Sequence, residues 1–312
     1  MKVAIVGATG ETGRSIVDGL INADTSFEIT ALIRPSSLAK PAVQSAKARG
    51  VEIVPADLQG RHDDLVSILK GMDVVISTIH YESLNDEIPL ANAAKAAGVK
   101  RYVPCFWATV GPRGVMRLRD RKEEILDHIH RLRLPYTVID VGWWYQITLP
   151  RIPSSRFDYA LVGPQNSIFG AGDVPSALTD VRDVGVYVAK VISDSQTLNK
   201  KIFAFTETWT QNEIFGLVEK ITGEKPEVTE VSAAEIEARV AEARKSATDI
   251  NQARAQYEYY HSWGVRGDNT PECAKYLGYL LYNDLYPGAK GRSLGNFVQE
   301  ILDGNAAKAY SA

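Results

Sequence analysis

The stretch KVAIVGATGETG, residues 2–13, decides the fold of this chain. An apolar run of strand type enters a turn with glycine at every third position, and a helical pattern follows. Glycines let a backbone turn tightly and approach a ligand closely, and the N-terminus of a helix presents N–H groups to an anion. The spacing G-x-x-G-x-x-G is a variant of the dinucleotide fingerprint, and its place between a strand and a helix makes it specific. A glycine turn without a ligand is the alternative. The motif predicts a pyrophosphate site made by Gly7, Thr9, Gly10, Glu11, Thr12 and Gly13.

The second predicted strand, residues 28–33, ends in Arg34 and not in an acidic residue. An acidic residue about 20 positions past the glycines usually binds the ribose 2′-hydroxyl of NAD, whereas an arginine there accommodates a 2′-phosphate. Ser36 and Lys40 follow and could add donors. A solvated loop arginine is the alternative reading. The residues favour NADP(H) over NAD(H) as the cofactor.

Composition and charge exclude several classes of protein. The chain has 312 residues, of which 45% are hydrophobic and 23% charged, and its net charge is −3. Nothing in this balance suggests a nucleic-acid partner, and no apolar run approaches the roughly 18 residues of a membrane span. Two cysteines give neither a disulfide framework nor a metal cluster. The first residues enter a strand directly, so we expect no signal peptide and a soluble protein of the cytoplasm.

The first half of the chain alternates regularly between strand and helix patterns. Further strands are expected at 51–55, 73–78, 100–105 and 136–140, and helices near 11–23, 37–49, 61–70, 85–97 and 117–132. Such alternation predicts an α/β fold: a Rossmann-type, doubly wound parallel sheet with a smaller C-terminal substrate lobe. Ligands bind at the carboxyl ends of such strands. Asp57, Thr78 and His80 lie at these ends and join the predicted cofactor site.

The second half is less regular. Residues 146–177 suggest a loop with short strands, 201–205 a strand, and 180–193, 210–222 and 232–258 helices. The aromatic residues between 257 and 286 suggest core packing or the wall of an aromatic substrate pocket. We expect an NADP-binding domain over 1–153, rejoined by 178–206, and a substrate-binding lobe over 154–177 and 207–312.

The chain also resembles a known family. Gly7 to Gly13, Arg34 with Lys40, and the segments 121–125 and 134–137 are similar to the NmrA-like, isoflavone-reductase-like branch of atypical short-chain dehydrogenases. The similarity spans roughly residues 1–215 and is clearest before 145. Segments 117–120 and 143–145 most resemble fungal isoflavone-reductase-like proteins of secondary metabolism. No tyrosine is followed four positions later by lysine, so the Tyr-x-x-x-Lys pair of other short-chain dehydrogenases is missing.

The resemblance implies a catalytic residue. Members carry a lysine 13 positions ahead of the proline in a Pro-Tyr-Thr sequence, and counting back from Pro135 gives Lys122. A partly desolvated lysine suits acid–base work or contact with the nicotinamide ribose. A solvent-facing helix lysine is the alternative. The family's Ser-Glu pair after the fifth strand is replaced here by Cys105-Phe106, followed by Trp107, which implies a more apolar pocket. The residues expected near nicotinamide or substrate are Phe106, Trp107, Gly142, Trp143 and Tyr145.

These observations predict an NADPH-dependent reductase that acts on the carbonyl, enone or benzylic ether of a small aromatic or polyketide-like metabolite. Two alternatives stay open: an NADP-sensing regulatory protein of the NmrA type without chemistry, and a non-redox isomerase or cyclase on the same fold. We expect a small-molecule partner, no nucleic acid, no membrane, and a monomer or homodimer. The histidines have no metal-ligand spacing, so we expect no metal.

Overall fold

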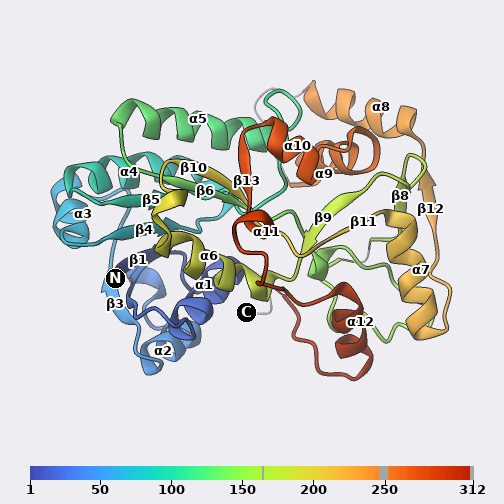
Figure 1. Ribbon diagram of the computed structural model, residues 1–312, viewed down its shortest axis with the longest axis horizontal. Coiled ribbons are helices and arrows are strands. Elements are labelled where there is room, and N and C mark those ends of the chain that lie inside the picture. Colours follow the sequence, from blue (N-terminus) through green and yellow to red (C-terminus); the bar gives the residue numbers. More distant parts are fainter. Residues whose placement is uncertain (164, 246–251, 310–312) are drawn as a thin grey trace. The chain divides into compact units, whose positions relative to one another are not determined.

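The computed structural model describes residues 1–163, 165–245 and 252–309 (Figure 1). The chain divides into two compact units, each of which is assembled from separate segments. Unit 1 contains Met1–Trp107, Arg121–Ile139 and Arg182–Ile202. Unit 2 contains Ala108–Asp120, Asp140–Val181 and Phe203–Ala312.

Unit 1 is built on a five-stranded parallel sheet in the order β3-β2-β1-β4-β5. The central strand β1 pairs with both β2 and β4, so that Val3 lies opposite Ile29 on one side and Val74 on the other. Beyond β5 a parallel bridge joins Tyr102 to Tyr136, directly before β6, and β10 borders β6. The strands are β1 (Lys2–Val6), β2 (Glu28–Ile33), β3 (Glu52–Pro55), β4 (Val74–Ser77), β5 (Arg101–Val103), β6 (Thr137–Asp140) and β10 (Lys200–Phe203). The predicted parallel sheet is confirmed.

Helices cover both faces of this sheet, as the doubly wound prediction requires. Figure 1 shows α4 and α5 on one side of the strands and α1 and α6 on the other. The α-helices are α1 (Glu11–Ile21), α2 (Pro41–Ala48), α3 (His62–Leu69), α4 (Glu87–Ala96), α5 (Arg117–Leu132) and α6 (Val184–Ser193). Short 3-10 turns are η1 (Pro35–Ser37), η2 (Tyr81–Asp86), η4 (Val181–Asp183) and η5 (Ser195–Thr197).

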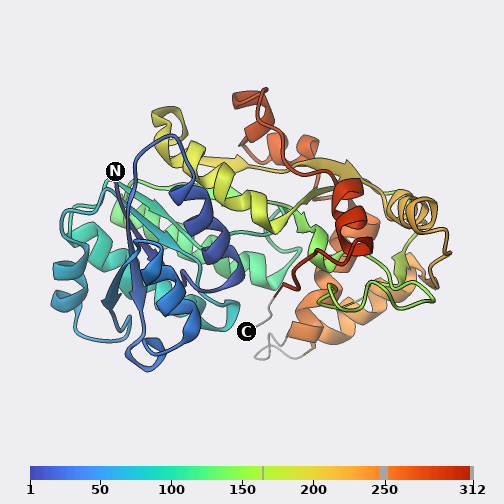
Figure 2. The same cartoon turned by 90° about the horizontal axis from the view of Figure 1, so that it is seen from below.

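The close approach of α1 and α6 fixes the helix that follows the glycine turn. These helices lie side by side in Figure 2 and cross backbone to backbone. A Cβ on Gly185 would lie 1.7 Å from the carbonyl oxygen of Ser15, and a Cβ on Gly19 would lie 2.1 Å from the carbonyl carbon of Gly185. The Gly185 N–H donates to the Ser15 hydroxyl at 3.0 Å. Two glycines and one serine therefore hold α1 in place against α6.

Unit 2 has two small sheets. β7 (Trp143–Trp144) and β11 (Glu207–Trp209) flank β9 (Ser176–Thr179), and β8 (Ser167–Phe169) pairs with β12 (Thr229–Val231) in parallel. β13 spans Tyr279–Leu281, η3 spans Tyr145–Ile147, and a π-helical turn spans Ser262–Arg266. The helices are α7 (Gln211–Thr222), α8 (Ala233–Arg244), α9 (Gln252–His261), α10 (Pro271–Tyr276), α11 (Tyr282–Leu285) and α12 (Leu294–Leu302).

The single helix expected over 232–258 was wrong. α8 ends at Arg244, and α9, which begins at Gln252, packs back against it. Part of the expected helix, 246–251, lies outside the described residues. The buried residues of α8 are Ile236, Val240 and Ala243, and this apolar stripe is satisfied by packing against another helix rather than by continuing the same one.

Candidate functional site

The three glycines of the turn after β1 have different neighbours. Gly7 has φ +80°, and a Cβ there would lie 2.4 Å from the carbonyl oxygen of Thr78. A Cβ on Gly13 would lie 2.1 Å from the carbonyl oxygen of Gly7. Both positions therefore require glycine for the fold itself. A Cβ on Gly10 would meet only the Gly7 oxygen, at 3.5 Å, which is an ordinary contact. The fold does not need glycine at position 10, so the open space beside it is available to a ligand.

The first turn of α1 has no side-chain cap. Gly10 is its N-cap residue, with φ −78° and ψ 173°, and its N–H donates to the Gly7 carbonyl at 2.9 Å. The free N–H groups and the positive end of the helix dipole favour an anion at this position. Glu11 stands in the same turn, where it forms an ion pair with Arg14. Thr9 and Thr12 are half-buried beside the turn. The geometry suits a phosphate group.

The carboxyl end of β2 carries two uncommitted cations. Arg34 directly follows the strand, and Pro35 starts the 3-10 turn η1, whose last residue accepts the Lys40 N–H at 3.1 Å. Arg34, Ser36 and Lys40 are exposed. Within the described parts of the chain, neither the Arg34 guanidinium nor the Lys40 ammonium has a hydrogen bond or ion pair. Two free positive charges beside a hydroxyl match the chemistry of a phosphate monoester.

The other residues predicted at the strand ends differ in their surroundings. Thr78 follows β4 and is brought against Gly7, and its hydroxyl donates to the Val6 carbonyl at 2.8 Å. Asp57 is exposed and accepts the Gln59 N–H at 3.0 Å, which closes a local turn. His80 is exposed and lies 3.5 Å from a Glu82 carboxylate oxygen. Thr78 shapes the glycine turn, whereas Asp57 and His80 have partners in their own loops.

Lys122 is not a solvent-facing helix lysine. Only 7% of its surface is exposed, although α5 carries exposed charges at Arg121 and Glu124. Its Nζ donates to the main-chain carbonyl of Phe106, in the turn after β5. Burial of a lysine is costly unless its ammonium has partners. The structure thus places the buried Nζ of this α5 lysine against the turn that follows the carboxyl end of β5.

The turn after β5 is strained and anchored on both sides. Trp107 has φ +36°, which is unusual for a residue other than glycine. Its indole N–H donates to the Ser77 carbonyl at 2.7 Å and its backbone N–H to the Ile139 carbonyl at 3.2 Å. Phe106 and Trp107 are 1% and 6% exposed. Both side chains are buried, and the two hydrogen bonds of Trp107 anchor the turn whose carbonyl accepts Lys122 Nζ.

A buried carboxyl that the sequence analysis did not single out lies in the same place. Glu87, on α4, is 1% exposed and accepts the Cys105 N–H at 2.8 Å and the Tyr102 hydroxyl at 3.2 Å. Burial raises the pKa of Glu87 to about 7, although the Cys105 N–H and the charge of Lys122 oppose the rise. Burial also raises the pKa of the Cys105 thiol to about 12, so this cysteine is neutral.

A sequence signal for Glu87 exists. Leu90, Ala91 and Ala94 follow it at the spacing of one helix face, and all of them are buried. An acidic residue on an apolar stripe is either paired or functional. Its place on the apolar face of the predicted helix 85–97 is therefore a signal that the residues alone contain.

The three candidates of unit 2 belong to its framework. Gly142 has φ +72°, and a Cβ there would lie 2.4 Å from the Ala177 carbonyl oxygen. Trp143 lies in the hydrophobic core of the unit, with its ring 5.0 Å from Trp263. Tyr145 is fully buried, and its hydroxyl donates to Glu207 at 3.2 Å. Packing accounts for the positions of all three.

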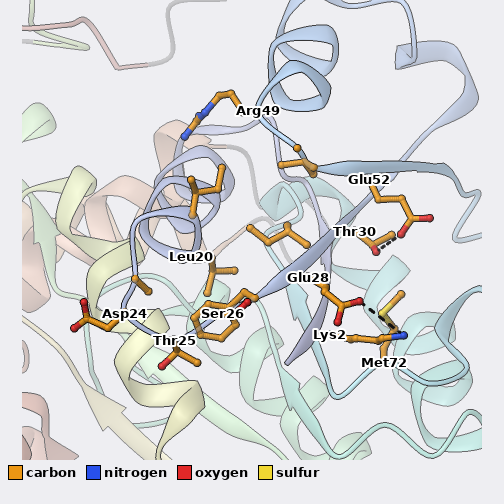
Figure 3. Close-up of a pocket in the computed structure, with 16 residues that line it drawn as sticks. Lys2, Leu20, Asp24, Thr25, Ser26, Glu28, Thr30, Arg49, Glu52 and Met72 are labelled. Carbon is orange, nitrogen blue, oxygen red and sulfur yellow. Dashed lines mark hydrogen bonds and ion pairs between the residues drawn. The ribbon is translucent and has the colours of Figure 1, made fainter.

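A hollow of 740 Å³ lies at the opposite edge of the unit 1 sheet, at the amino ends of the strands. Figure 3 shows the Lys2–Glu28 ion pair and the hydrogen bond from Thr30 to Glu52 along its wall, with Arg49 at its rim. Arg49 forms an ion pair with Asp18 on α1 at 2.6 Å. The edge carries none of the predicted site residues, which lie after the carboxyl ends.

Among the described residues, no helix combines the length and apolar character needed to cross a membrane. No group of three or more His, Cys, Asp or Glu side chains in the same parts of the chain could hold a metal ion.

Comparison with known proteins identifies the family. Residues 1–276 match the model of the NmrA-like family, so the chain belongs to that family. An asnovolin J 5′,6′-dehydrogenase of Aspergillus novofumigatus is 48% identical over 314 residues, which cover 97% of this chain and 96% of that protein. An isoflavone reductase-like protein of Olea europaea is 28% identical over 315 residues, which cover 96% of this chain and 98% of that protein.

Solved structures share the fold. The complex of leucoanthocyanidin reductase with NADPH from Vitis vinifera has a TM-score of 0.82 at 21% identity and covers 97% of this chain and 100% of that one. A crystal structure of isoflavone reductase has a TM-score of 0.80 at 24% identity, with 96% and 98% covered. The predicted α/β fold and the resemblance to isoflavone-reductase-like proteins are both confirmed.

Proposed function

We propose that this protein is an NADP-dependent oxidoreductase that transfers hydride between the nicotinamide and a small, largely apolar metabolite. The observation that carries the proposal is the combination, in one unit, of a ligand-ready glycine turn, two uncommitted cations after β2 and a buried lysine after β5. Unit 1 then binds the cofactor and unit 2 supplies substrate contacts. The named activities of the relatives, a dehydrogenase and several reductases, support the class of reaction.

The cofactor fits residues of unit 1. The pyrophosphate would lie on the N–H groups at the start of α1, beside Gly10, where a side chain is absent and the helix has no cap. The 2′-phosphate would be held by Arg34 and Lys40, with the Ser36 hydroxyl nearby. This assignment explains why two cations stand exposed without an acidic partner. It also predicts discrimination against NAD(H), which lacks the 2′-phosphate.

Lys122 is the acid–base residue in this proposal. A bound nicotinamide would supply the hydride in reduction and accept it in dehydrogenation. In reduction of a carbonyl or enone, the substrate oxygen would receive the π electron pair, and the Lys122 ammonium would give that oxygen a proton. In dehydrogenation the same lysine, as the amine, takes the proton. Its burial and its bond to the Phe106 carbonyl hold Nζ in one place for either direction.

The residues of the turn after β5 favour an apolar, aromatic or polyketide-like substrate. The family's Ser-Glu pair is replaced by Cys105 and Phe106, and the Cys105 thiol is neutral. The turn after β5 therefore carries aromatic side chains and a neutral thiol rather than charge. We also propose that the protein works in the cytoplasm as a monomer or homodimer.

A panel assay tests this function. The protein is incubated with NADPH and aromatic ketones, enones and benzylic ethers, and separately with NADP⁺ and the matching saturated compounds, while the absorbance of the reduced nicotinamide is followed. NADPH carrying deuterium at the transferable position should deliver the label to the product, as seen by mass spectrometry. Binding of NADP(H) without turnover of any compound, together with a protein partner whose affinity depends on NADP⁺, would instead establish a sensor.

A further inference from the structure

Glu87 is a buried carboxyl that the proposed hydride transfer does not use. It lies on α4, inside unit 1, and its Oε1 accepts both the Cys105 N–H and the Tyr102 hydroxyl. An isolated buried carboxylate is strongly disfavoured, so its presence requires compensating partners. The Cys105 N–H and the side chains of Ser77 and Tyr102 lower the pKa of Glu87, and the charge of Lys122 lowers it further by a smaller amount. The charge of Lys122 also lowers the pKa of Cys105.

The hydrogen bonds connect Glu87 to the catalytic candidate through one turn. Glu87 holds the N–H of Cys105, and the next residue, Phe106, provides the carbonyl that accepts Lys122 Nζ. The residue after Phe106 is Trp107, and its indole N–H donates to the Ser77 carbonyl. The positive φ of Trp107 makes this turn unfavourable by itself, so the anchors at its two ends keep it in shape.

The charges around Glu87 leave Lys122 as its counterpart. Tyr102 and Cys105 face the carboxyl, and burial raises the pKa of both, so they stay neutral at ordinary pH. Glu123, the neighbour of Lys122 on α5, has an ion pair with Lys201 at 3.2 Å. An opposite charge in a poorly solvated place favours the ionised form of its partner by about one to three pH units.

We propose that Glu87 is the positioning residue of Lys122: it fixes the Phe106 carbonyl under the lysine and, as a carboxylate, holds Lys122 in its ammonium form. The proposal deepens the function proposed above and rests on it for the role of Lys122. Its physical content is independent of turnover, because it concerns the protonation of one lysine. The two groups then titrate as a coupled pair.

The test measures that protonation directly. The protein is labelled with ε-¹³C lysine, the Lys122 resonance is assigned by its loss in Lys122→Arg, and its shift is followed against pH. In Glu87→Gln the amide oxygen can still accept the Cys105 N–H, but the charge is gone. The Lys122 midpoint should then fall by about one pH unit or more. The control variant Glu124→Gln removes an exposed carboxylate from α5, the helix that carries Lys122, and should leave the Lys122 midpoint unchanged. An unchanged midpoint in folded Glu87→Gln overturns the proposal.

A second measurement needs no variant at position 87. In the wild-type protein the Lys122 resonance should show a separate inflection near pH 7, where Glu87 titrates. A curve without that inflection overturns the coupling even if Glu87→Gln does not fold. If a substrate is found, the alkaline limb of the reductive pH–rate profile in Glu87→Gln should move to lower pH by the same amount, with KM unchanged. Failure to find a substrate would affect the proposed function and not the titration.

Discussion

Gly10 offers a way to separate folding from cofactor binding. Position 10 is the N-cap of α1, and a Cβ there meets only one backbone oxygen, at 3.5 Å. Serine is a favoured N-cap residue, whereas Gly7 and Gly13 have backbone atoms where a Cβ would go. Gly10→Ser should therefore fold normally and lose nucleotide affinity. Gly13→Ser should fail at the level of folding.

The magnitudes follow from the contacts. Glycine and serine differ by only a few tenths of a kcal/mol at an N-cap, so the free energy of unfolding of Gly10→Ser should stay within about 0.5 kcal/mol of wild type. A side chain forced against the bound pyrophosphate should cost about 1–3 kcal/mol, as overpacked contacts do, or about 5- to 150-fold in Kd. In Gly13→Ser the Cβ would lie 2.1 Å from a backbone oxygen. Its loss of stability should reach about 3 kcal/mol or more.

The assay pairs urea unfolding with calorimetric titration of NADPH for wild type, Gly10→Ser and Gly13→Ser. Circular dichroism establishes that Gly10→Ser is folded before its affinity is measured. Wild-type affinity in folded Gly10→Ser would refute the reasoning, because the pyrophosphate could not then lie beside this residue. A stable Gly13→Ser would show that the turn is not as closely packed as the structure has it.

Three further substitutions test the cations and the buried acid. Arg34→Ala should weaken NADPH binding by about 1.5–3 kcal/mol, as loss of a charge-assisted bond does, and leave NADH binding nearly unchanged. Calorimetric titration measures both affinities, with Arg49→Ala at the opposite edge of the sheet as the control. Equal losses for the two nucleotides would contradict the 2′-phosphate assignment. Lys122→Ala should lower kcat by about 10²–10⁴-fold with little change in NADPH affinity. Steady-state kinetics with a substrate from the panel measures kcat. Wild-type turnover in the variant would show that Lys122 is not the acid–base residue. The pKa of Glu87 is raised to about 7 in the folded protein, so around neutral pH the native state binds a proton that the unfolded state does not. As the pH rises from 5 to 8, wild type should therefore lose about 2–3 kcal/mol of stability relative to Glu87→Gln. Urea unfolding at both pH values measures this difference, and a difference that does not change with pH would contradict the raised pKa.

The sequence was sufficient for the sheet of unit 1. Parallel strands buried on both faces appear as continuous apolar runs, so 2–6 and 28–33 could be bounded from the residues alone. Their carboxyl ends predict a ligand edge, and the structure brings Gly7 and Thr78 together there. The strand β7 was not predicted, because an element of two residues is too short to show a periodic pattern.

Long-range contacts explain what could not be predicted. Tertiary packing ended α8 at Arg244, although the polar sequence beyond it has the composition of a continuing helix. Trp143 and Tyr145 follow a strand end, which predicts ligand contact; both belong to the core cluster of unit 2, and their contact with a ligand stays a prediction. Whether Lys122 was buried could not be read from a helix rich in exposed charges, because the acceptor of its ammonium is a backbone carbonyl.

The most direct test of the account is one calorimetric comparison of NADPH and NADH on the wild-type protein. If the glycine turn and the cations after β2 form an NADP site, NADPH should bind tighter than NADH by about tenfold or more, which corresponds to at least one charge-assisted contact with the 2′-phosphate. The preference should shrink as ionic strength rises, because Arg34 and Lys40 are exposed. Equal affinities, or no binding of either nucleotide, would contradict the central claim.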